Sequence, residues 1–219
     1  MQALAGELPC MRRMSERVFL LSPASCAGRR AALLFGGRGA FPLALHLAGG
    51  GTVPLGEAFA WLSGLYFRGK LAYARTFASP PTGVADALVI TTNRGLVSAE
   101  VPVSAEDLRA FGAVPIDTED PRYREPLERD AHALAAQVGD DGVVVLLGSV
   151  ASGKYVDVLL DVFGERLHFP REFVGRGDMS RGGLMLRCVE SGEELDYVPV
   201  AGAVRRGARP PKLEPRRWT

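Results

Sequence analysis

The feature that most constrains this chain is the run Val143-Val144-Val145-Leu146-Leu147, five consecutive apolar residues that pass directly into a glycine. An unbroken apolar run of this kind is typical of a strand covered on both faces in a parallel sheet. A second run, Val18 to Leu21, ends at Ser22-Pro23, and a third, Ala87 to Thr91, ends at the turn Asn93-Arg94-Gly95. Because helical patterns separate these runs, the sequence predicts an α/β fold.

Helices are expected between the strands. Pro121 to Val138 predicts a long surface helix with apolar residues on one stripe. A capping box at Ser104 to Asp107 opens a shorter helix that ends near Gly112. Further helices are expected at residues 41–48, 57–63, 65–77, 154–163 and 183–189, and further short strands at 166–169 and 195–200. The whole pattern predicts a three-layer α/β/α sandwich with a mostly parallel central sheet of about four to five strands.

A length of 219 residues suits one domain with a substantial core. We expect a flexible N-terminal extension over residues 1–16, an α/β domain over 17–201 and a basic, disordered tail over 202–219. The tail has a net charge of +5, whereas the whole chain has a net charge of +1, so the remainder of the chain has a net charge of −4. A basic tail on an acidic body predicts an electrostatic contact with RNA or DNA. A solvated terminus without a specific partner is the alternative.

Several classes of protein are disfavoured by the composition. No apolar run approaches the roughly 18 residues that span a bilayer, and the N-terminus lacks a secretory pattern. The sequence therefore predicts a cytoplasmic protein with no membrane contact. The three cysteines and three histidines are widely spaced, so we expect neither a disulfide framework nor a metal site, and no cofactor. The oligomeric state is left open.

The loop after the first strand is the first candidate for a binding site, because ligands of α/β folds lie outside the carboxyl ends of the strands. If a helix begins near Gly28, its free N–H groups favour an anion, and Cys26 would have a lowered pKa and act as a nucleophile. A capping serine and a buried structural cysteine are the alternative interpretation of the same loop. The candidate residues in this loop are Ser22, Ser25, Cys26, Arg29 and Arg30.

The segment from Gly148 to Lys154 fits the pattern G-x-x-x-x-G-K between a strand and a helix, which is the context of a phosphate-binding loop. Tyr155 occupies the position of the hydroxyl residue that normally binds magnesium. We therefore expect Gly148, Ser149 and Lys154 to cradle a phosphate or a base edge rather than to support ATP or GTP hydrolysis.

A third loop is rich in glycine and arginine. It contains Arg176, Asp178, Ser180 and Arg181, which predict a phosphate clamp with Asp178 as a possible base. A solvated turn before a capped helix is the alternative. Elsewhere, Tyr66 is positioned to stack on a base or to pack in the core, and Asn93 and Arg94 either contact a ligand or only form a turn.

Two short stretches carry a resemblance to a known family. Leu21 to Arg30, L-S-P-A-S-C-A-G-R-R, is similar to a P-C-S-x-K-K motif, and Thr91 to Val97, T-T-N-R-G-L-V, is similar to a T-S-P-L-G-x-V-P turn. Both motifs belong to the lysine-transferring domain of archaeosine synthase, within a wider group of α/β sandwiches resembling uracil-DNA glycosylases. The resemblance spans roughly residues 18–165. The resemblance implies an α/β sandwich of the uracil-DNA-glycosylase-like type and a pocket the size of a base or nucleotide.

The chain departs from that family at the reactive positions. Cys26 lies two places beyond the position that matches the family cysteine, and the pair Arg29-Arg30 replaces two lysines. The later serine/histidine motif of the family is absent from the sequence. Compared with glycosylases, no aspartate follows the first strand and no histidine lies in the Asn93 turn. The resemblance therefore leaves the reaction open.

Together these patterns predict an enzyme that modifies a nucleic-acid base or nucleoside, either glycosylase-like or a base transferase. Its catalytic candidates are Ser25, Cys26 and Asp178, beside a positively lined pocket formed by the strand-end loops. Such an enzyme would extrude its target base from a duplex. The alternatives are a non-catalytic nucleotide- or RNA-binding module and, third, a structural partner protein.

Overall fold

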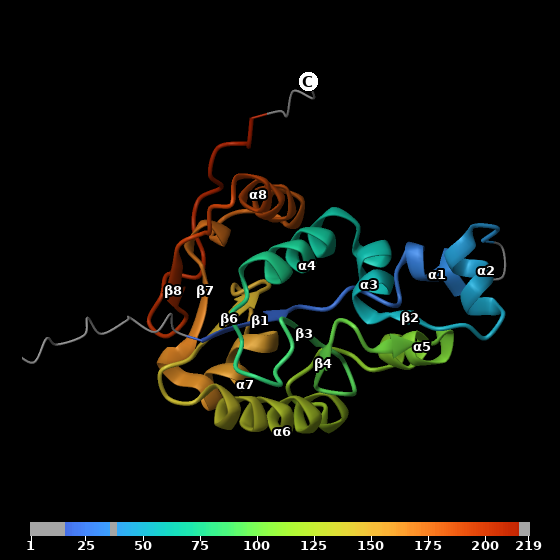
Figure 1. The fold of residues 1–219 in the computed structure, drawn as a ribbon, viewed down its shortest axis with the longest axis horizontal. Coiled ribbons are helices and arrows are strands. Elements are labelled where there is room, and N and C mark those ends of the chain that lie inside the picture. The colour runs from blue at the N-terminus through green and yellow to red at the C-terminus, as the bar shows by residue number, and fades with distance from the viewer. Residues whose placement is uncertain (1–15, 36–38, 215–219) are drawn as a thin grey trace, which may run out of the picture.

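The computed structural model describes residues 16–35 and 39–214 (Figure 1). The predicted N-terminal extension, apart from Glu16, and residues 215–219 of the predicted tail lie outside the described residues. The strands of the main sheet are β1 (Arg17–Leu21), β3 (Ala87–Ile90), β4 (Leu96–Ser98), β6 (Val143–Leu147), β7 (Leu167–Pro170) and β8 (Tyr197–Pro199). A separate antiparallel pair is formed by β2 (Val53–Pro54) and β5 (Pro102–Val103).

The helices lie between these strands. They are α1 (Arg29–Phe35), α2 (Pro42–Ala48), α3 (Leu55–Ser63), α4 (Leu65–Phe77), α5 (Ala105–Ala113), α6 (Pro121–Val138), α7 (Gly153–Phe163) and α8 (Asp178–Ser191), with 3-10 turns η1 (Gly164–Arg166) and η2 (Arg171–Phe173). The predicted helices over residues 65–77 and 121–138 are confirmed. The capping box is also confirmed, since Ser104 and Asp107 each accept a hydrogen bond from the other's backbone N–H.

The main sheet has the order β4-β3-β1-β6-β7-β8. The four inner strands run parallel, and the edge strands β4 and β8 are antiparallel to their neighbours. The predicted α/β class and mostly parallel sheet are therefore confirmed, but the expected four to five strands are too few. β4 was missed because its three residues are too short for a periodic pattern; it pairs with β3 only because the turn at Asn93-Arg94-Gly95 folds it back.

Helices cover both faces of the sheet. In Figure 1, α4 and α8 lie above it and α6 and α7 below it. Alternate residues of β1 divide between these two sides: Phe19 and Leu21 join the cluster with α3, α4 and α8, while Val18 and Leu20 join the cluster with α6 and α7. The run in β6 alternates in the same way. Burial on both faces explains why residues 18–21 of β1 and residues 144–147 of β6 are all apolar.

Helices α4 and α8 touch backbone to backbone. A Cβ at Gly182 would lie 2.7 Å from the carbonyl oxygen of Leu65, and one at Gly69 would lie 2.7 Å from that of Gly182. Helix α8 begins at Asp178 and includes most of the segment that was predicted to be a glycine-rich loop. The predicted start of this helix near Gly183 is therefore wrong. Close packing against α4 outweighs the low helix propensity of glycine.

The C-terminal segment has no helix or strand over residues 204–214, but several hydrogen bonds join it to the body. Arg206 donates two hydrogen bonds, of 3.1 and 3.0 Å, to the carbonyl oxygen of Ala151. Arg176 donates to the carbonyl oxygen of Pro211 at 3.4 Å. Part of the positive charge assigned to this segment is thereby used in intramolecular contacts. No helix among the described residues has the length and apolar character needed to cross a bilayer.

The glycine contact yields a prediction for stability. Gly182→Ala should lower the free energy of unfolding by about 1–3 kcal/mol, because the added methyl group meets the backbone of α4. The neighbouring Gly183→Ala is the matched control, since its Cβ would lie 3.5 Å from Leu213, at ordinary contact. That control should be neutral or stabilising by up to about 1 kcal/mol, since alanine favours helix. Urea denaturation of both variants measures the difference, and equal unfolding energies would refute the close contact.

Candidate functional site

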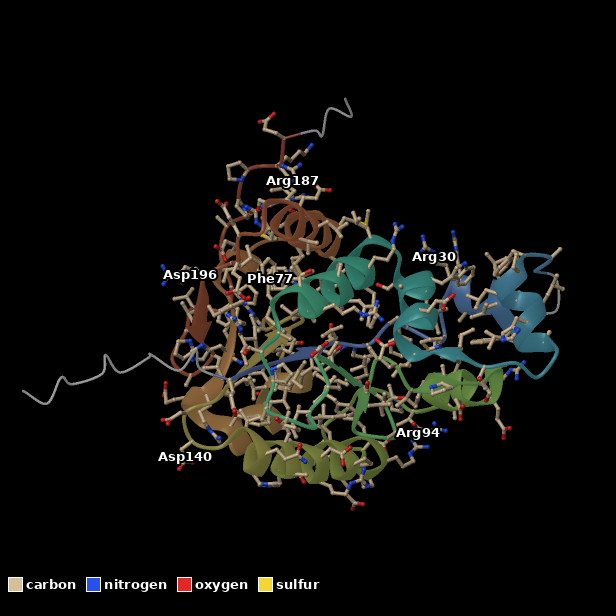
Figure 2. All side chains as sticks on the ribbon, in the orientation of Figure 1. Arg30, Phe77, Arg94, Asp140, Arg187 and Asp196 are labelled. Carbon is tan, nitrogen blue, oxygen red and sulfur yellow. The ribbon has the colours of Figure 1, made fainter. Side chains whose placement is uncertain are left out.

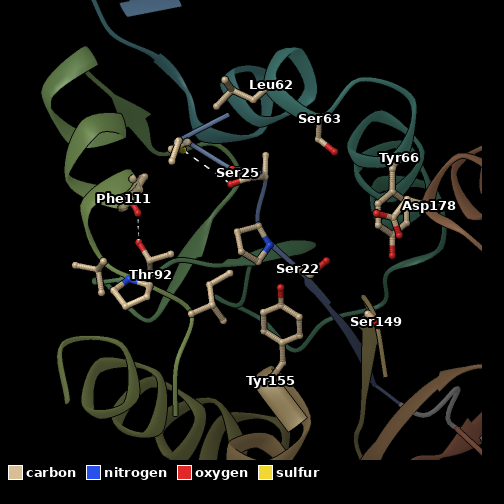
Figure 3. Close-up of a pocket in the computed structure, with 18 residues that line it drawn as sticks. Ser22, Ser25, Leu62, Ser63, Tyr66, Thr92, Phe111, Ser149, Tyr155 and Asp178 are labelled. Carbon is tan, nitrogen blue, oxygen red and sulfur yellow. Dashed lines mark hydrogen bonds between the residues drawn. The ribbon is translucent and has the colours of Figure 1, made fainter. Parts of the chain in front are cut away.

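A cavity of about 530 Å³ opens where β1, β3 and β6 end (Figure 3). This volume is in the range of pockets that hold small organic ligands. Its wall comes from segments that are far apart in the sequence: the loop after β1, the α3–α4 junction, Thr92 after β3, the end of α5, Ser149 after β6, and the first turns of α7 and α8. The predicted convergence of strand-end loops on one site is therefore observed for these segments.

The cavity lies at the topological switch point of the sheet. From β1 the chain crosses to β3 through α4 on one face, and from β6 it crosses to β7 through α7 on the other face. Crossovers that leave neighbouring strands in opposite directions open a crevice at the strands' carboxyl ends, where ligands of α/β proteins bind. Ser22 and Ser149, which follow β1 and β6, both line this crevice.

Ser22 is held by a buried lysine. The Nζ atom of Lys70 lies 3.0 Å from Ser22 Oγ and also contacts the carbonyl oxygen of Ser22. Lys70 is 1% exposed and comes from the middle of α4. The rings of Tyr66 and Phe67 lie 4.5 and 4.7 Å from its Nζ atom. Lys70 therefore contacts a hydroxyl, a carbonyl and two aromatic faces.

The electrostatic surroundings of Lys70 are unusual for a lysine. None of the ion pairs among the described residues includes it. Burial lowers the pKa of Lys70 to about 7, with Asp178 opposing this shift and Arg181 adding to it. A substantial share of the amine is therefore uncharged at neutral pH.

Two tyrosine side chains line the cavity from helices on opposite faces of the sheet. Tyr66, on α4, is 6% exposed, and its hydroxyl makes no well-formed hydrogen bond among the described residues, although the Arg181 side chain lies beside it. Tyr155, on α7, points into the cavity from the other side (Figure 3). Burial raises the pKa of each to about 12, so both are protonated donors at neutral pH. A buried hydroxyl without a well-formed hydrogen bond carries a desolvation cost that a polar ligand would relieve.

The cysteine of the site differs from its predicted chemistry. Cys26 lines the cavity, but burial raises the pKa of its thiol to about 12, opposite to the expected lowering. Its Sγ atom lies 3.9 Å from the carbonyl oxygen of Ala24, and no cation pairs with it in the described part of the chain. The thiol is therefore protonated at neutral pH and lacks the reactivity of a thiolate.

The predicted site residues divide into two groups. Those that line the cavity are Ser22, Ser25, Cys26, Tyr66, Ser149 and Asp178. Gly148 lies directly behind Ser22, where an added Cβ would be 3.0 Å from the serine Cβ. Those outside the lining are Arg29, Arg30, Asn93, Arg94, Lys154, Arg176, Ser180 and Arg181.

Most of the predicted phosphate ligands have other partners. Arg30 donates to the carbonyl oxygen of Trp61 at 3.0 Å, Arg94 pairs with Asp107, and Arg176 donates to Ser180 Oγ at 3.2 Å. Arg181 is buried and donates to the carbonyl oxygen of Phe173. Arg29 and Lys154 are exposed. Among the described residues no arginine or lysine lines the cavity, so it is not the positively lined pocket that the sequence predicted.

Lys70 and Tyr155 are the site residues that the sequence analysis missed. Lys70 belongs to the same helical stripe as Tyr66, Tyr73 and Ala74, all of which are buried. Tyr66 and Ala74 are each four residues from Lys70, and Tyr73 is three residues from it. This helical spacing is the sequence signal that Lys70 points inward. Its contact with Ser22 depends on how α4 packs over β1.

A larger depression of about 970 Å³ lies over α2 and α3, where Phe41 and Trp61 stack at 4.9 Å. It is mostly apolar and lies away from the strand ends, so we assign the site to the smaller cavity, where polar groups converge. No three histidine, cysteine or acidic side chains are grouped as metal ligands within residues 16–35 and 39–214. No family model, curated protein or solved structure matches the chain, so the geometry of the site carries the functional argument.

The buried lysine predicts a pH-dependent stability. Because its pKa is about 7 in the folded protein and about 10.4 in an unfolded chain, the unfolded state binds more protons between these values. The free energy of unfolding of the wild type, relative to Lys70→Met, should therefore rise as the pH increases from 7 to 10. Denaturant melts of the two proteins at several pH values measure this difference. A difference that stays constant over the range would show that Lys70 is charged in the folded state.

Proposed function

We propose that this cavity binds a nucleobase or nucleoside and that the protein is an enzyme modifying such a base, either a glycosylase-like hydrolase or a base transferase. The observation that carries the proposal is the combination of aromatic and hydroxyl groups around one volume of about 530 Å³. Tyr66, Phe111 and Tyr155 supply aromatic surface for a planar ligand, and Ser22, Ser25 and Ser149 supply hydrogen-bonding groups for its edges.

The charge of the residues that line the cavity limits the class of ligand that it can bind. Among the described residues, Asp178 is the one aspartate, glutamate, lysine or arginine that lines the cavity, and it lies at the mouth with 66% of its side chain exposed. A cavity without arginine or lysine offers nothing to neutralise a polyphosphate. The proposal therefore favours a base or nucleoside over a nucleoside triphosphate, with any phosphate of a longer substrate held outside the cavity.

The resemblance to the archaeosine synthase domain agrees with this proposal. Its two motif stretches contribute the cavity wall at residues 22–27 and at Thr92, which follow β1 and β3. The proposal also takes the helices on the two sheet faces as the outer layers of a three-layer sandwich of the uracil-DNA-glycosylase-like type. In this proposal Asp178 accepts a proton or binds an amine of the base, and Ser25 binds a base edge.

Binding is tested with a pair of tyrosine variants. Tyr66→Phe removes only a hydroxyl that makes no well-formed hydrogen bond in the protein, so it should weaken nucleoside binding about 3- to 10-fold, the equivalent of one hydrogen bond, with little loss of stability. Tyr123→Phe is the control: Tyr123 is buried outside the cavity lining and donates to the carbonyl oxygen of Lys154 at 2.8 Å. This control should cost about 1 kcal/mol of stability and leave affinity unchanged.

Calorimetric titration with free bases, nucleosides and nucleoside triphosphates measures these affinities. The proposed ligand class would be rejected if triphosphates bound more tightly than nucleosides, or if neither bases nor nucleosides bound. Equal nucleoside affinity of Tyr66→Phe and wild type would place the ligand elsewhere.

Turnover is tested separately. Asp178→Asn should slow release of base from modified or unmodified oligonucleotides at least 10-fold in single-turnover assays, because it removes a proton acceptor at the cavity mouth. Asp140→Asn is the control, since Asp140 precedes β6 and so lies at the amino end of the strands, opposite to the cavity (Figure 2). Nucleoside binding without any turnover by the wild type would favour the non-catalytic binding module instead.

A further inference from the structure

The contact between Ser22 and Lys70 has the arrangement of a nucleophile and its base. We propose that Ser22 is a nucleophile, that Lys70 removes its hydroxyl proton, and that the cavity thereby carries out acyl transfer on an ester, thioester or amide. Ser22 Oγ lies 3.0 Å from Lys70 Nζ, within the distance needed for direct proton transfer. Serine–lysine pairs are a recognised variant of the serine–histidine arrangement.

The position of each partner suits its role. Ser22 follows β1 and lines the cavity, so an acyl group there can reach its hydroxyl. Lys70 lies behind Ser22, outside the lining, so it reaches a substrate only through Ser22. The amine also donates to the carbonyl oxygen of Ser22, which orients its lone pair when it is uncharged.

The surroundings of Lys70 favour an amine that accepts a proton. The charged or titratable groups facing it are Tyr66 on its own helix and Asp178 and Arg181 on α8. Asp178 pairs with Arg181 at 3.5 Å, which partly offsets its effect on the lysine. Burial then lowers the pKa of Lys70 to about 7, the value that suits a general base at neutral pH.

Backbone groups beside Ser22 supply the remaining requirement, a site for the developing oxyanion. The N–H groups of residues 149–152 donate to no backbone carbonyl in the described part of the chain. Their loop abuts the serine at Gly148, where a Cβ would lie 3.2 Å from Ser22 Oγ. Free N–H groups at a strand-to-helix turn next to a nucleophile are typical donors to an oxyanion.

The step balances as follows. Ser22 Oγ bonds to the carbonyl carbon as its proton passes to Lys70, and the collapsing intermediate expels the leaving group, which takes that proton from the ammonium. Water or another acceptor then attacks the acyl-serine, again losing its proton to Lys70, and Ser22 is released when the proton returns to its oxygen. No oxidant, metal or cofactor takes part.

This inference goes beyond the proposed function, since it concerns the reaction class rather than the ligand that the cavity binds. A nucleoside that carries an acyl group is one substrate that would agree with both the proposed ligand and the proposed reaction. The two are tested independently, because a small reactive phosphorus compound without a base reports on Ser22 alone.

The test uses a small alkyl fluorophosphonate on the full-length protein. The serine oxygen bonds to phosphorus, fluoride leaves, and the proton passes to Lys70. Peptide mass mapping should find the label on Ser22, and the labelling rate should rise with pH through about 7 and then level, following deprotonation of Lys70. Lys70→Met and Lys70→Arg should each reduce the rate at least 100-fold, because methionine has no base and arginine stays protonated.

Matched controls separate chemistry from folding. Lys154→Met alters an exposed lysine outside the cavity, and Ser98→Ala alters a serine on β4; both should label at the wild-type rate. Circular dichroism melts establish which variants are folded. If neither Lys70 variant folds, the pH profile of the wild type decides.

The proposal is overturned if Ser22 is unlabelled, if the rate ignores pH around 7, or if folded Lys70 variants label at the wild-type rate. If the wild-type protein bound no nucleoside but Ser22 was still labelled, that result would count against the proposed function and not against this inference.

Discussion

The pairing of β1 with β6 is the interaction on which the rest of the structure depends. The two strands match over five residues in parallel register, and four residues of each are fully buried. Because their side chains alternate between two apolar clusters, the pair requires helices on both faces. The same register brings Ser22 next to Gly148 and so opens the crevice at the strand ends.

The contact between α4 and α8 adds chemistry to that crevice. Gly69 and Gly182 let the two backbones meet, which brings Lys70 over the end of β1 and Asp178 to the cavity mouth. Burying a lysine without a carboxylate partner costs stability, since charge is disfavoured in a medium of low polarity. Proteins accept such costs most often at functional sites, where a shifted pKa is useful.

The arginines show why residue types in a loop do not by themselves define a binding site. Arg30 and Arg181 donate to main-chain carbonyl groups, and Arg94 pairs with an aspartate. Hydrogen bonds to these partners hold helix and strand ends together, and the cavity is left with hydroxyls and aromatic rings. The resulting site suits a neutral, planar ligand better than an anion.

By itself, the sequence determined the elements whose signals are local: the buried runs of β1, β3 and β6, the stripe of α6, the Ser104 capping box, and the strand ends at which a ligand would lie. Tertiary structure alone decided three other matters. The edge strand β4 exists because a turn returns it to β3, α8 begins early because its glycines pack on α4, and Lys70 meets Ser22 across 48 residues of chain. Periodicity reports which face of an element is buried, whereas the partner that buries it depends on contacts between distant segments.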